Sequence, residues 1–347
     1  MFGKKENLIG IDIGSYSVKM IELKGKKSGY LLKSISEVVL PEDVISEGSI
    51  VDYAEVTRCI REAFQKGNFS HKKVASALKG TNVIAKKVTL AIEDEKNFSE
   101  TFRWEAEQYI GRKDLEDYNI DYEVIGNIKQ GEHVDVVIAV ARKDLIMDLS
   151  SVIESAGLKP MAVDLSVFTL INAFEVNYGI EEDVIAIVDI GNSSTQIVFV
   201  KNGVYEFSRE VNYSGKNCVE MIQQRLGITR EDAVAKLFDI EAVEYDEELR
   251  SIINDFNIQL ATEVKNSINM FLTSGQIKTN RCYICGGGSV IYGLKEVFEQ
   301  RLDISVNQFN PFANIEIDKS VDMEFLNNNL YKFNCALGLA LRKVDDR

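Results

Sequence analysis

The sequence predicts an α/β protein built from two similar lobes that face each other across a ligand-binding crevice. The first observation is a pair of matching segments, residues 9–23 and 186–200, which align on Asp12 and Asp189. The second is length, because 347 residues exceed the size at which a single hydrophobic core usually serves a whole chain. The third is element order, since a β-hairpin followed by helices occurs in both halves.

Each matching segment contains an apolar run, Asp-Ile-Gly, three small or polar positions and a second apolar run. Two β-rich runs around a short Gly/Ser turn are typical of a hairpin. Each turn offers backbone N–H groups and hydroxyls, and an acidic residue ends the incoming strand. This chemistry suits a phosphate chain, whose oxygens accept from amides and hydroxyls while carboxylates organise a hydrated divalent cation. One such hairpin would more often be structural only, but the duplication favours phosphate binding.

The composition indicates an ordinary soluble protein, with 45% apolar and 27% charged residues. A net charge of −14 disfavours general binding to nucleic acid or anionic membranes, although a local basic patch would escape this argument. No run approaches the roughly 18–20 apolar residues that span a bilayer. Residues 1–7 lack the apolar stretch of a secretory signal, so we expect a cytoplasmic protein.

The cysteines and histidines exclude several classes of site. Five scattered cysteines do not predict a disulfide framework. Cys282 and Cys285 have metal-like spacing, but we favour buried thiols in a strand that precedes a glycine turn. His71 and His133 are the only histidines, so a Ser-His-Asp or Cys-His enzyme has little support. Neither a P-loop nor a Rossmann glycine pattern is present.

After the first hairpin we predict a strand at 30–39, a helix at 52–66 with Asp52 as its N-cap, and a strand at 73–78. Residues 80–157 then form a module of strand, helix, two strands and helix, which predicts an inserted subdomain. Its elements span 83–90, 99–110, 119–125, 134–141 and 143–155. It contains no convincing catalytic constellation.

In the second half, a strand at 159–164 leads to a helix at 166–176 with Ser166 as its N-cap. The second hairpin is extended by a strand at 203–210. The remaining predicted elements are helices at 218–226, 229–237, 246–273, 292–302 and 330–342, and strands at 281–285 and 304–309.

Three successive glycines, Gly286–Gly288, follow the strand at 281–285. They remove every β-carbon from the turn, so a flat ligand can approach the backbone closely. We favour binding over a purely structural turn. On the long helix at 246–273, the polar residues Glu263, Lys265 and Asn266 fit a ligand-binding role and a solvent-exposed face equally well.

These motifs resemble the actin/Hsp70/sugar-kinase superfamily. Asp12–Lys19 is similar to its first phosphate motif, Asp189–Thr195 to its second and Ile284–Ser289 to its adenosine motif. Together with Ile9–Leu23, the segments Trp104–Ile110 and Ala156–Pro160 and the pair Val163-Asp164 resemble the PilM family, FtsA-like proteins of type IV pilus assembly.

The resemblance covers nearly the whole chain and implies an actin/Hsp70/ribonuclease H-like fold with a central nucleotide cleft. The first lobe would comprise residues 1–79, 158–180 and 328–347, and the second lobe residues 181–327. The insert, residues 80–157, would correspond to the subdomain that FtsA-like proteins carry.

The resemblance also implies ATP and Mg²⁺ as ligands. Asp12 and Asp189 would orient Mg²⁺ through waters, and Asp164 would position an attacking water. The remaining residues implied to contact the nucleotide are Gly14, Ser15, Tyr16, Ser17 and Lys19 on one side of the phosphates, Gly191, Asn192, Ser193 and Ser194 on the other, Gly286, Gly287 and Gly288 at the adenine or α-phosphate, and Gly215, Lys216, Glu263 and Lys265 at the ribose and base.

The function implied is a cytoplasmic ATP-binding scaffold, at most a slow ATPase, recruited to the inner face of the cell membrane. Its partner would be the short cytoplasmic N-terminal segment of a PilN-like membrane protein, docked near the insert, alongside other pilus machinery. Residues 341–347 do not extend into an amphipathic membrane helix, which disfavours the FtsA role. The alternatives are a small-molecule kinase of the superfamily and a polymerising FtsA-like filament protein.

Overall fold

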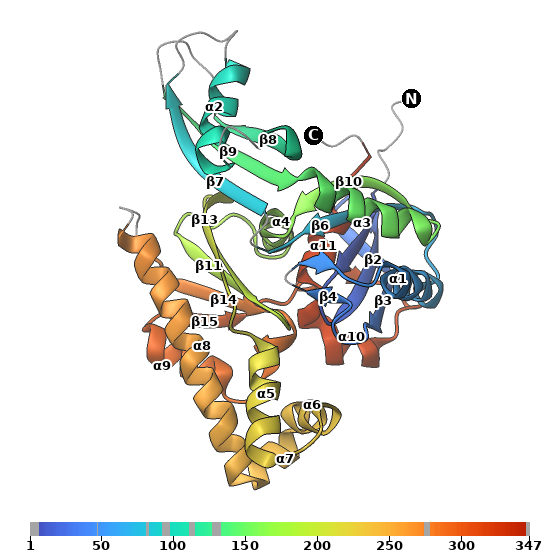
Figure 1. Ribbon diagram of the computed structural model, residues 1–347, viewed down its shortest axis with the longest axis vertical. Coiled ribbons are helices and arrows are strands. Elements are labelled where there is room, and N and C mark those ends of the chain that lie inside the picture. The colour runs from blue at the N-terminus through green and yellow to red at the C-terminus, as the bar shows by residue number, and fades with distance from the viewer. Residues whose placement is uncertain are drawn as a thin grey trace.

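The computed structural model contains two large β-sheets, one in each lobe, and a smaller sheet in the insert (Figure 1). It describes residues 7–46, 48–80, 83–91, 98–110, 115–126, 133–273 and 278–344. The insert lies at one end of the molecule and helices α5, α6 and α7 at the other, with the two large sheets between them (Figure 1). The predicted α/β class with a duplicated core is present.

The first lobe is built on a six-stranded sheet. In spatial order its strands are β10 (Lys159–Leu165), β6 (Lys73–Leu78), β1 (Ile9–Ile13), β2 (Ser17–Gly25), β3 (Tyr30–Val39) and β16 (Glu316–Ile317). The edge strand β16 lies within residues 181–327, which the sequence assigned to the second lobe, yet it pairs with β3 of the first lobe. The predicted lobe boundaries stay a prediction. A two-stranded ribbon, β4 (Ile45–Ser46) and β5 (Ser49–Ile50), follows β3.

The second lobe repeats the central connectivity of the first. Its five-stranded sheet has the order β13 (Val204–Val211), β12 (Thr195–Lys201), β11 (Ile185–Ile190), β14 (Arg281–Cys285) and β15 (Ser305–Gln308). β1 pairs antiparallel with β2 and parallel with β6, and β11 pairs antiparallel with β12 and parallel with β14. Both predicted hairpins are thus confirmed, and each is placed at the carboxyl end of a buried central strand.

The insert is a three-stranded antiparallel sheet, β7 (Val83–Ala91), β9 (His133–Arg142) and β8 (Tyr118–Ile125), with helix α2 (Phe98–Ile110) against it. Helix α3 (Lys143–Ser155) packs on α1 of the first lobe. On the other side, the Tyr205 hydroxyl donates to the Ala85 carbonyl at 2.9 Å and Lys87 pairs with Glu206 at 2.7 Å. The insert therefore contacts both lobes.

The remaining helices cover the sheets and connect the lobes. They are α1 (Tyr53–Gly67), α4 (Ser166–Tyr178), α5 (Gly215–Leu226), α6 (Arg230–Phe238), α7 (Ile240–Tyr245), α8 (Glu247–Thr273), α9 (Leu294–Leu302), α10 (Met323–Asn329) and α11 (Asn334–Ala340). Asp52 caps α1 as predicted, by accepting from the Glu55 amide. None of the helices in the described ranges combines the length and apolar character that crossing a bilayer requires.

Two predictions about helix ends are wrong. The single helix expected at 330–342 is a 3₁₀ turn, Leu330–Lys332, followed by α11, because Phe333 leaves helical torsions (φ −101°, ψ 8°). Ser166 is the first residue of α4 rather than its N-cap, because β10 runs straight into the helix through an extended Leu165. The Ser166 hydroxyl instead donates to Gln196 of the second lobe at 2.9 Å.

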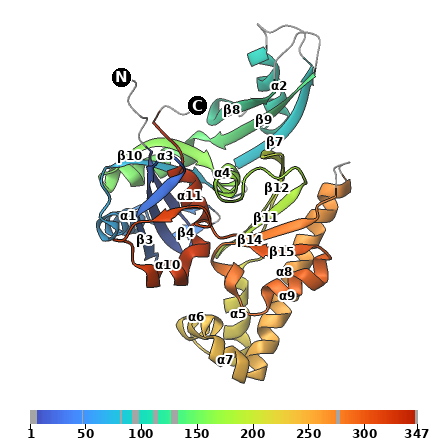
Figure 2. The same cartoon turned by 180° about the vertical axis from the view of Figure 1, so that it is seen from behind.

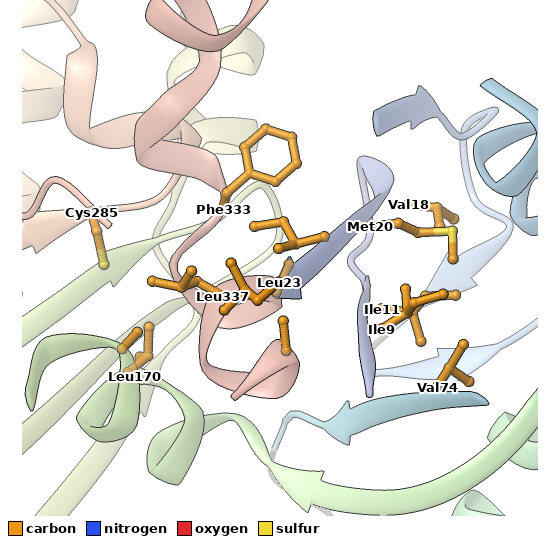
Figure 3. Close-up of a cluster of buried hydrophobic side chains, with 14 of the residues drawn as sticks. Ile9, Ile11, Val18, Met20, Leu23, Val74, Leu170, Cys285, Phe333 and Leu337 are labelled. Atoms are coloured by element: carbon orange, nitrogen blue, oxygen red, sulfur yellow. The ribbon is translucent and has the colours of Figure 1, made fainter. Parts of the chain in front are cut away.

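Helices α4 and α11 lie between the two large sheets (Figure 2). Leu337 of α11, Leu170 of α4 and Leu23 of β2 belong to one buried cluster (Figure 3). The packing brings backbones together: a β-carbon on Gly10 would meet the Ala336 carbonyl oxygen at 2.0 Å, and one on Gly338 would meet the Thr169 carbonyl oxygen at 1.9 Å. Only glycine fits at these two positions, so α11 sits tightly between β1 and α4.

Candidate functional site

A cavity of about 1050 Å³ lies between the two lobes, and both hairpin turns open into it. The sequence-predicted residues that line it are Asp12, Gly14, Ser15, Tyr16, Ser17, Lys19, Asp189, Gly191, Asn192, Ser193, Ser194, Gly215, Lys216, Gly286, Gly287 and Gly288. The fold thus brings sixteen separately predicted positions to one space. Their contacts to a ligand remain a prediction.

Asp12, at the end of β1, is held by two lysines. Its carboxylate lies 3.1 Å from the Lys19 ammonium and 2.7 Å from that of Lys79. Burial alone raises the pKa of the Asp12 carboxyl, but the two ammonium groups more than offset this and hold the pKa well below its usual range. Asp12 is therefore ionised, and two cations border the cavity beside it.

Asp189, at the same position of β11, has a different environment. In the part of the chain that the structure describes, no lysine or arginine lies within ion-pair distance of its carboxylate. Burial raises the pKa of the Asp189 carboxyl, with Lys79 opposing and Asp12 reinforcing the shift. Of the two hairpin aspartates, Asp189 is thus the one without an ion-pair partner among the described residues.

The two hairpin turns have the same internal bonds. The Gly14 amide donates to the Ser17 carbonyl at 3.1 Å, and the Gly191 amide to the Ser194 carbonyl at 3.0 Å. Ser17 donates to Glu37 of β3 at 2.7 Å, and Ser194 to Glu210 of β13. Each turn is therefore hydrogen-bonded to the strand that follows its hairpin in the chain, β3 in the first lobe and β13 in the second.

The N-terminus of α5 supports the second turn. The amides of Gly215 and Lys216 donate to the carbonyls of Gly191 and Asn192 at 3.1 and 2.9 Å. Ser214 forms a capping box with Asn217, which fixes the start of this helix. The first helical turn thus borders the same end of the cavity as the hairpins.

Polar contacts join the two lobes across the cavity. At the hairpin tips, the Ser15 hydroxyl donates to the Ser193 hydroxyl at 2.9 Å and accepts from the Asn192 amide at 3.4 Å. Between the helical end and the first lobe, Arg230 of α6 pairs with Glu42, which follows β3. The lobes are therefore closed on each other, and the space between them is bordered by both.

The glycine turn after β14 packs directly on β11, the first strand of the second hairpin. A β-carbon on Gly286 would meet the Asp189 carboxylate at 2.4 Å, and Gly286 has a φ of +84°. A β-carbon on Gly288 would meet the Ile190 side chain at 2.4 Å. Close packing and a positive φ therefore give these glycines a structural role, whether or not they also contact a ligand.

Cys282 and Cys285 are free and buried, as we favoured.

Beyond α5, the cavity wall changes from polar to apolar. Helices α6 and α7 contribute Val234, Phe238 and Ile240, and the segment after the glycine turn contributes Val290 and Tyr292. Several of these side chains remain in contact with solvent: Phe238 is 49% exposed and Ile240 64%. The cavity therefore has a charged hairpin end and an apolar helical end.

Three predicted residues do not line the cavity. Asp164 is buried at the end of β10, 3.7 Å from Arg342, and burial raises the pKa of its carboxyl. Glu263 accepts from Gln259 on the face of α8, and Lys265 donates to the Arg301 carbonyl at 2.9 Å. The helical period identified the polar face of α8, but that face is turned away from the cavity.

Sequence reasoning missed Lys79, Glu37, Glu210 and Arg230, all of which line the cavity. Lys79 directly follows β6, which pairs in parallel with β1, so its position beside Asp12 could be inferred from sheet order. Glu37 and Glu210 gave no signal, because their role depends on a strand register that only the folded sheet defines.

Comparison with known proteins identifies the family. Residues 10–344 match the family of type IV pilus assembly protein PilM. The chain belongs to this family. A solved PilM-PilN type IV pilus biogenesis complex contains a chain with 25% identity to this one, a TM-score of 0.86, and coverage of 99% of this chain and 100% of that one. This confirms the PilM resemblance and the actin-like fold.

More distant structures share the fold alone. The ethanolamine utilization protein EutJ from Carboxydothermus hydrogenoformans has 14% identity and a TM-score of 0.61, covering 97% of this chain and 90% of its own. MreB5 of Spiroplasma citri bound to AMPPNP has 10% identity and a TM-score of 0.54, covering 96% and 95%. That structure contains a bound nucleotide analogue.

Proposed function

We propose that this PilM-family protein binds ATP with Mg²⁺ in the interlobe cavity and docks a PilN-like membrane protein at the inner face of the cell membrane. The observation that carries the nucleotide part is the convergence of two matching hairpins, with Lys19 and Lys79, on one cavity. Family membership and the PilM-PilN complex among its relatives support the docking part.

The hairpin end fits a polyphosphate. Gly14 and Gly191 leave the turns unhindered, Lys19 and Lys79 supply positive charge, and charge-assisted bonds from such groups are the strong ones. In this proposal Ser15, Tyr16 and Ser17 border the phosphates from the first lobe, and the residues Asn192, Ser193 and Ser194 border them from the second.

The residues present also fit a hydrated Mg²⁺. Mg²⁺ is usually held by one or two carboxylates together with water and substrate phosphates. Asp189 and Asp12 line the cavity, and Asp189 is free of ion pairs among the described residues. Bound there, Mg²⁺ would neutralise phosphate charge, and the two carboxylates would orient its waters.

Partner docking is assigned to the insert. The PilM-PilN complex supports a PilN-like partner, whose short cytoplasmic N-terminal segment would bind as an extended peptide. The insert offers an antiparallel sheet whose edge strands are β7 and β8, and it contacts both lobes. The protein would thus serve as a cytoplasmic docking platform and, at most, a slow ATPase.

Calorimetric titration of the full chain with ATP, with and without Mg²⁺, tests the nucleotide site. We expect binding that Mg²⁺ strengthens, and we expect Asp189→Ala to remove most of that strengthening. Asp183→Ala is the matched control, because Asp183 is a surface carboxylate outside the cavity. Unchanged ATP and Mg²⁺ affinity in Asp189→Ala would contradict the metal assignment.

A synthetic peptide of the cytoplasmic PilN segment tests the docking site. We expect it to bind and to slow amide hydrogen exchange in the strands of the insert. Protection confined to the second lobe would overturn the assignment.

The two alternatives have weaker support. A small-molecule kinase needs a base beside an acceptor pocket, and Asp164, the candidate, does not line the cavity. ATP consumption that depends on a sugar or acid acceptor would restore this alternative. Filament-sized light scattering with ATP and Mg²⁺ would restore the FtsA-like one.

A further inference from the structure

The two ends of the cavity differ in what they can recognise. The hairpin end presents lysines and hydroxyls that suit a polyphosphate and carboxylates that suit its cation, and none of these groups recognises the rest of a nucleotide. Specificity for the base must therefore arise at the helical end, where α5, α6, α7 and residues 290–292 form the wall.

Apolar side chains dominate this wall. Val219 comes from α5, Val234 and Phe238 from α6, Ile240 from α7, and Val290 and Tyr292 from the segment after the glycine turn. Four of them are more than one-third exposed although they line a cavity: Tyr292 at 37%, Val290 at 47%, Phe238 at 49% and Ile240 at 64%. An apolar wall that is open to water can be covered by the flat face of a base.

Three polar side chains also line this wall, those of Lys216, Arg230 and Tyr292. Lys216 lies in the first turn of α5, next to the second hairpin, and the Tyr292 hydroxyl is the polar group of an otherwise apolar ring. Arg230 pairs with Glu42. Among the described cavity-lining residues of α5–α7 and 290–292, none is a carboxylate or a carboxamide, the groups that distinguish guanine from adenine most directly.

We propose that the helical end holds the base by apolar contact and that the protein therefore binds ATP and GTP with similar affinity. This inference rests on nucleotide binding in the cavity, as proposed above. An apolar pocket discriminates by only about 10- to 200-fold, whereas a site built to hydrogen-bond a substrate rejects a mismatched analogue by about 10⁴- to 10⁵-fold. The wall described here belongs to the first kind.

The test compares ATP, GTP and inorganic triphosphate as competitors of a fluorescent ATP analogue on the full chain with Mg²⁺. We expect ATP and GTP to differ by about tenfold or less. Inorganic triphosphate, which lacks a base, should bind more weakly than either.

Phe238→Ala provides the second measurement. It should weaken ATP and GTP alike by about 5- to 100-fold, the range for loss of a base–aromatic contact, and leave triphosphate binding unchanged. Tyr245→Ala is the matched control, because Tyr245 is an aromatic residue of α7 that is 87% exposed and does not line the cavity.

GTP binding more than about tenfold weaker than ATP binding would overturn the inference, because the two affinities would then not be similar and the wall would discriminate between the bases. Equal loss of triphosphate binding in Phe238→Ala would also overturn it, since the side chain would then act on the phosphate end. If ATP, GTP and triphosphate all failed to bind, the proposed function would fail. Tight ATP binding with no GTP binding would leave that function intact and remove only this inference.

Discussion

The two hairpins share a scaffold but differ in charge. In the first lobe Asp12 stands opposite Lys19 on β2, and Lys19 stands opposite Glu37 on β3. In the second lobe Asp189 stands opposite Gln196, and Gln196 opposite Glu210. The strand register is the same, and one position differs: a lysine in the first lobe is a glutamine in the second.

The flanking strand differs as well. In the first lobe, β6 is followed by Lys79, which pairs with Asp12. In the second lobe, β14 is followed by the glycine turn, and Gly286 packs against Asp189. The two lobes therefore share the same strand pairing around the hairpin. They differ in charge, because Lys19 and Lys79, the two lysines that contact Asp12, both lie in the first lobe. We infer that the first lobe neutralises phosphate charge and that the second supplies a carboxylate for the cation.

The largest expected effect on ATP affinity comes from exchanging the residues at the one position that differs, Lys19 in the first lobe and Gln196 in the second. Lys19→Gln, which copies the second lobe, should weaken ATP binding by about 10- to 100-fold, because a hydrogen bond to a charged group contributes about 1.5–3 kcal/mol. Gln196→Lys, the converse, should strengthen binding of ATP in the absence of Mg²⁺, because it adds a cation beside Asp189. Calorimetric titration measures both.

Lys265→Met is the control for these variants, because Lys265 lies on the outer face of α8 and does not line the cavity. It should leave ATP affinity unchanged. If Lys19→Gln and Lys265→Met gave the same affinity, the division of roles between the lobes would be wrong.

An intermediate effect is expected from the glycines that occupy equivalent positions in the two turns. A β-carbon on Gly191 would lie 2.9 Å from the Ser194 carbonyl oxygen, whereas the nearest atoms to one on Gly14 lie at 3.5 Å. Gly191→Ala should therefore lower the free energy of unfolding by about 1–3 kcal/mol. Gly14→Ala should change it by less than about 0.5 kcal/mol. Thermal unfolding of the two variants compares them, and equal losses would show that the turns are equally tight.

The smallest effect is expected at the hairpin tips. Ser15→Ala and Ser193→Ala both remove the exposed Ser15–Ser193 hydrogen bond, so each should cost about 0.5–1 kcal/mol of unfolding free energy. Ser15→Ala also removes the longer bond from Asn192, so the double variant should cost no more than Ser15→Ala alone. Additive losses would mean that the tips act independently and do not couple the lobes.

Local sequence predicted the parts of the site that local geometry determines. The hairpins around Asp12 and Asp189 and the turn at 286–288 carry their own signals, namely apolar alternation and glycine. The long helix α8 was also predicted, but Glu263 and Lys265, expected at the ribose and base, are not among the residues that line the cavity. Helical periodicity shows which residues share a face, and it does not show which face the neighbouring sheet covers.

The missed residues depend on contacts between distant segments. Lys79 follows an unremarkable short strand and becomes part of the site because β6 lies beside β1. The break at Phe333 was missed for a related reason: residues 330–342 contain no proline that excludes a continuous helix, and the polar Asn334 did not by itself indicate a new helix start. In the structure α11 begins at Asn334, and its Gly338 lies against the backbone of α4.

The tight seating of α11 has a mechanical consequence. A helix whose backbone touches β1 on one side and α4 on the other cannot translate along either without forcing the chains apart, so we expect the lobes to rotate about this crossing rather than slide. Cys335, at the start of α11, lines the cavity, so the pivot would lie at the cavity wall. The amplitude of opening then grows with distance from α11, and the Arg230–Glu42 pair, which joins α6 to the segment after β3, would separate as the lobes open.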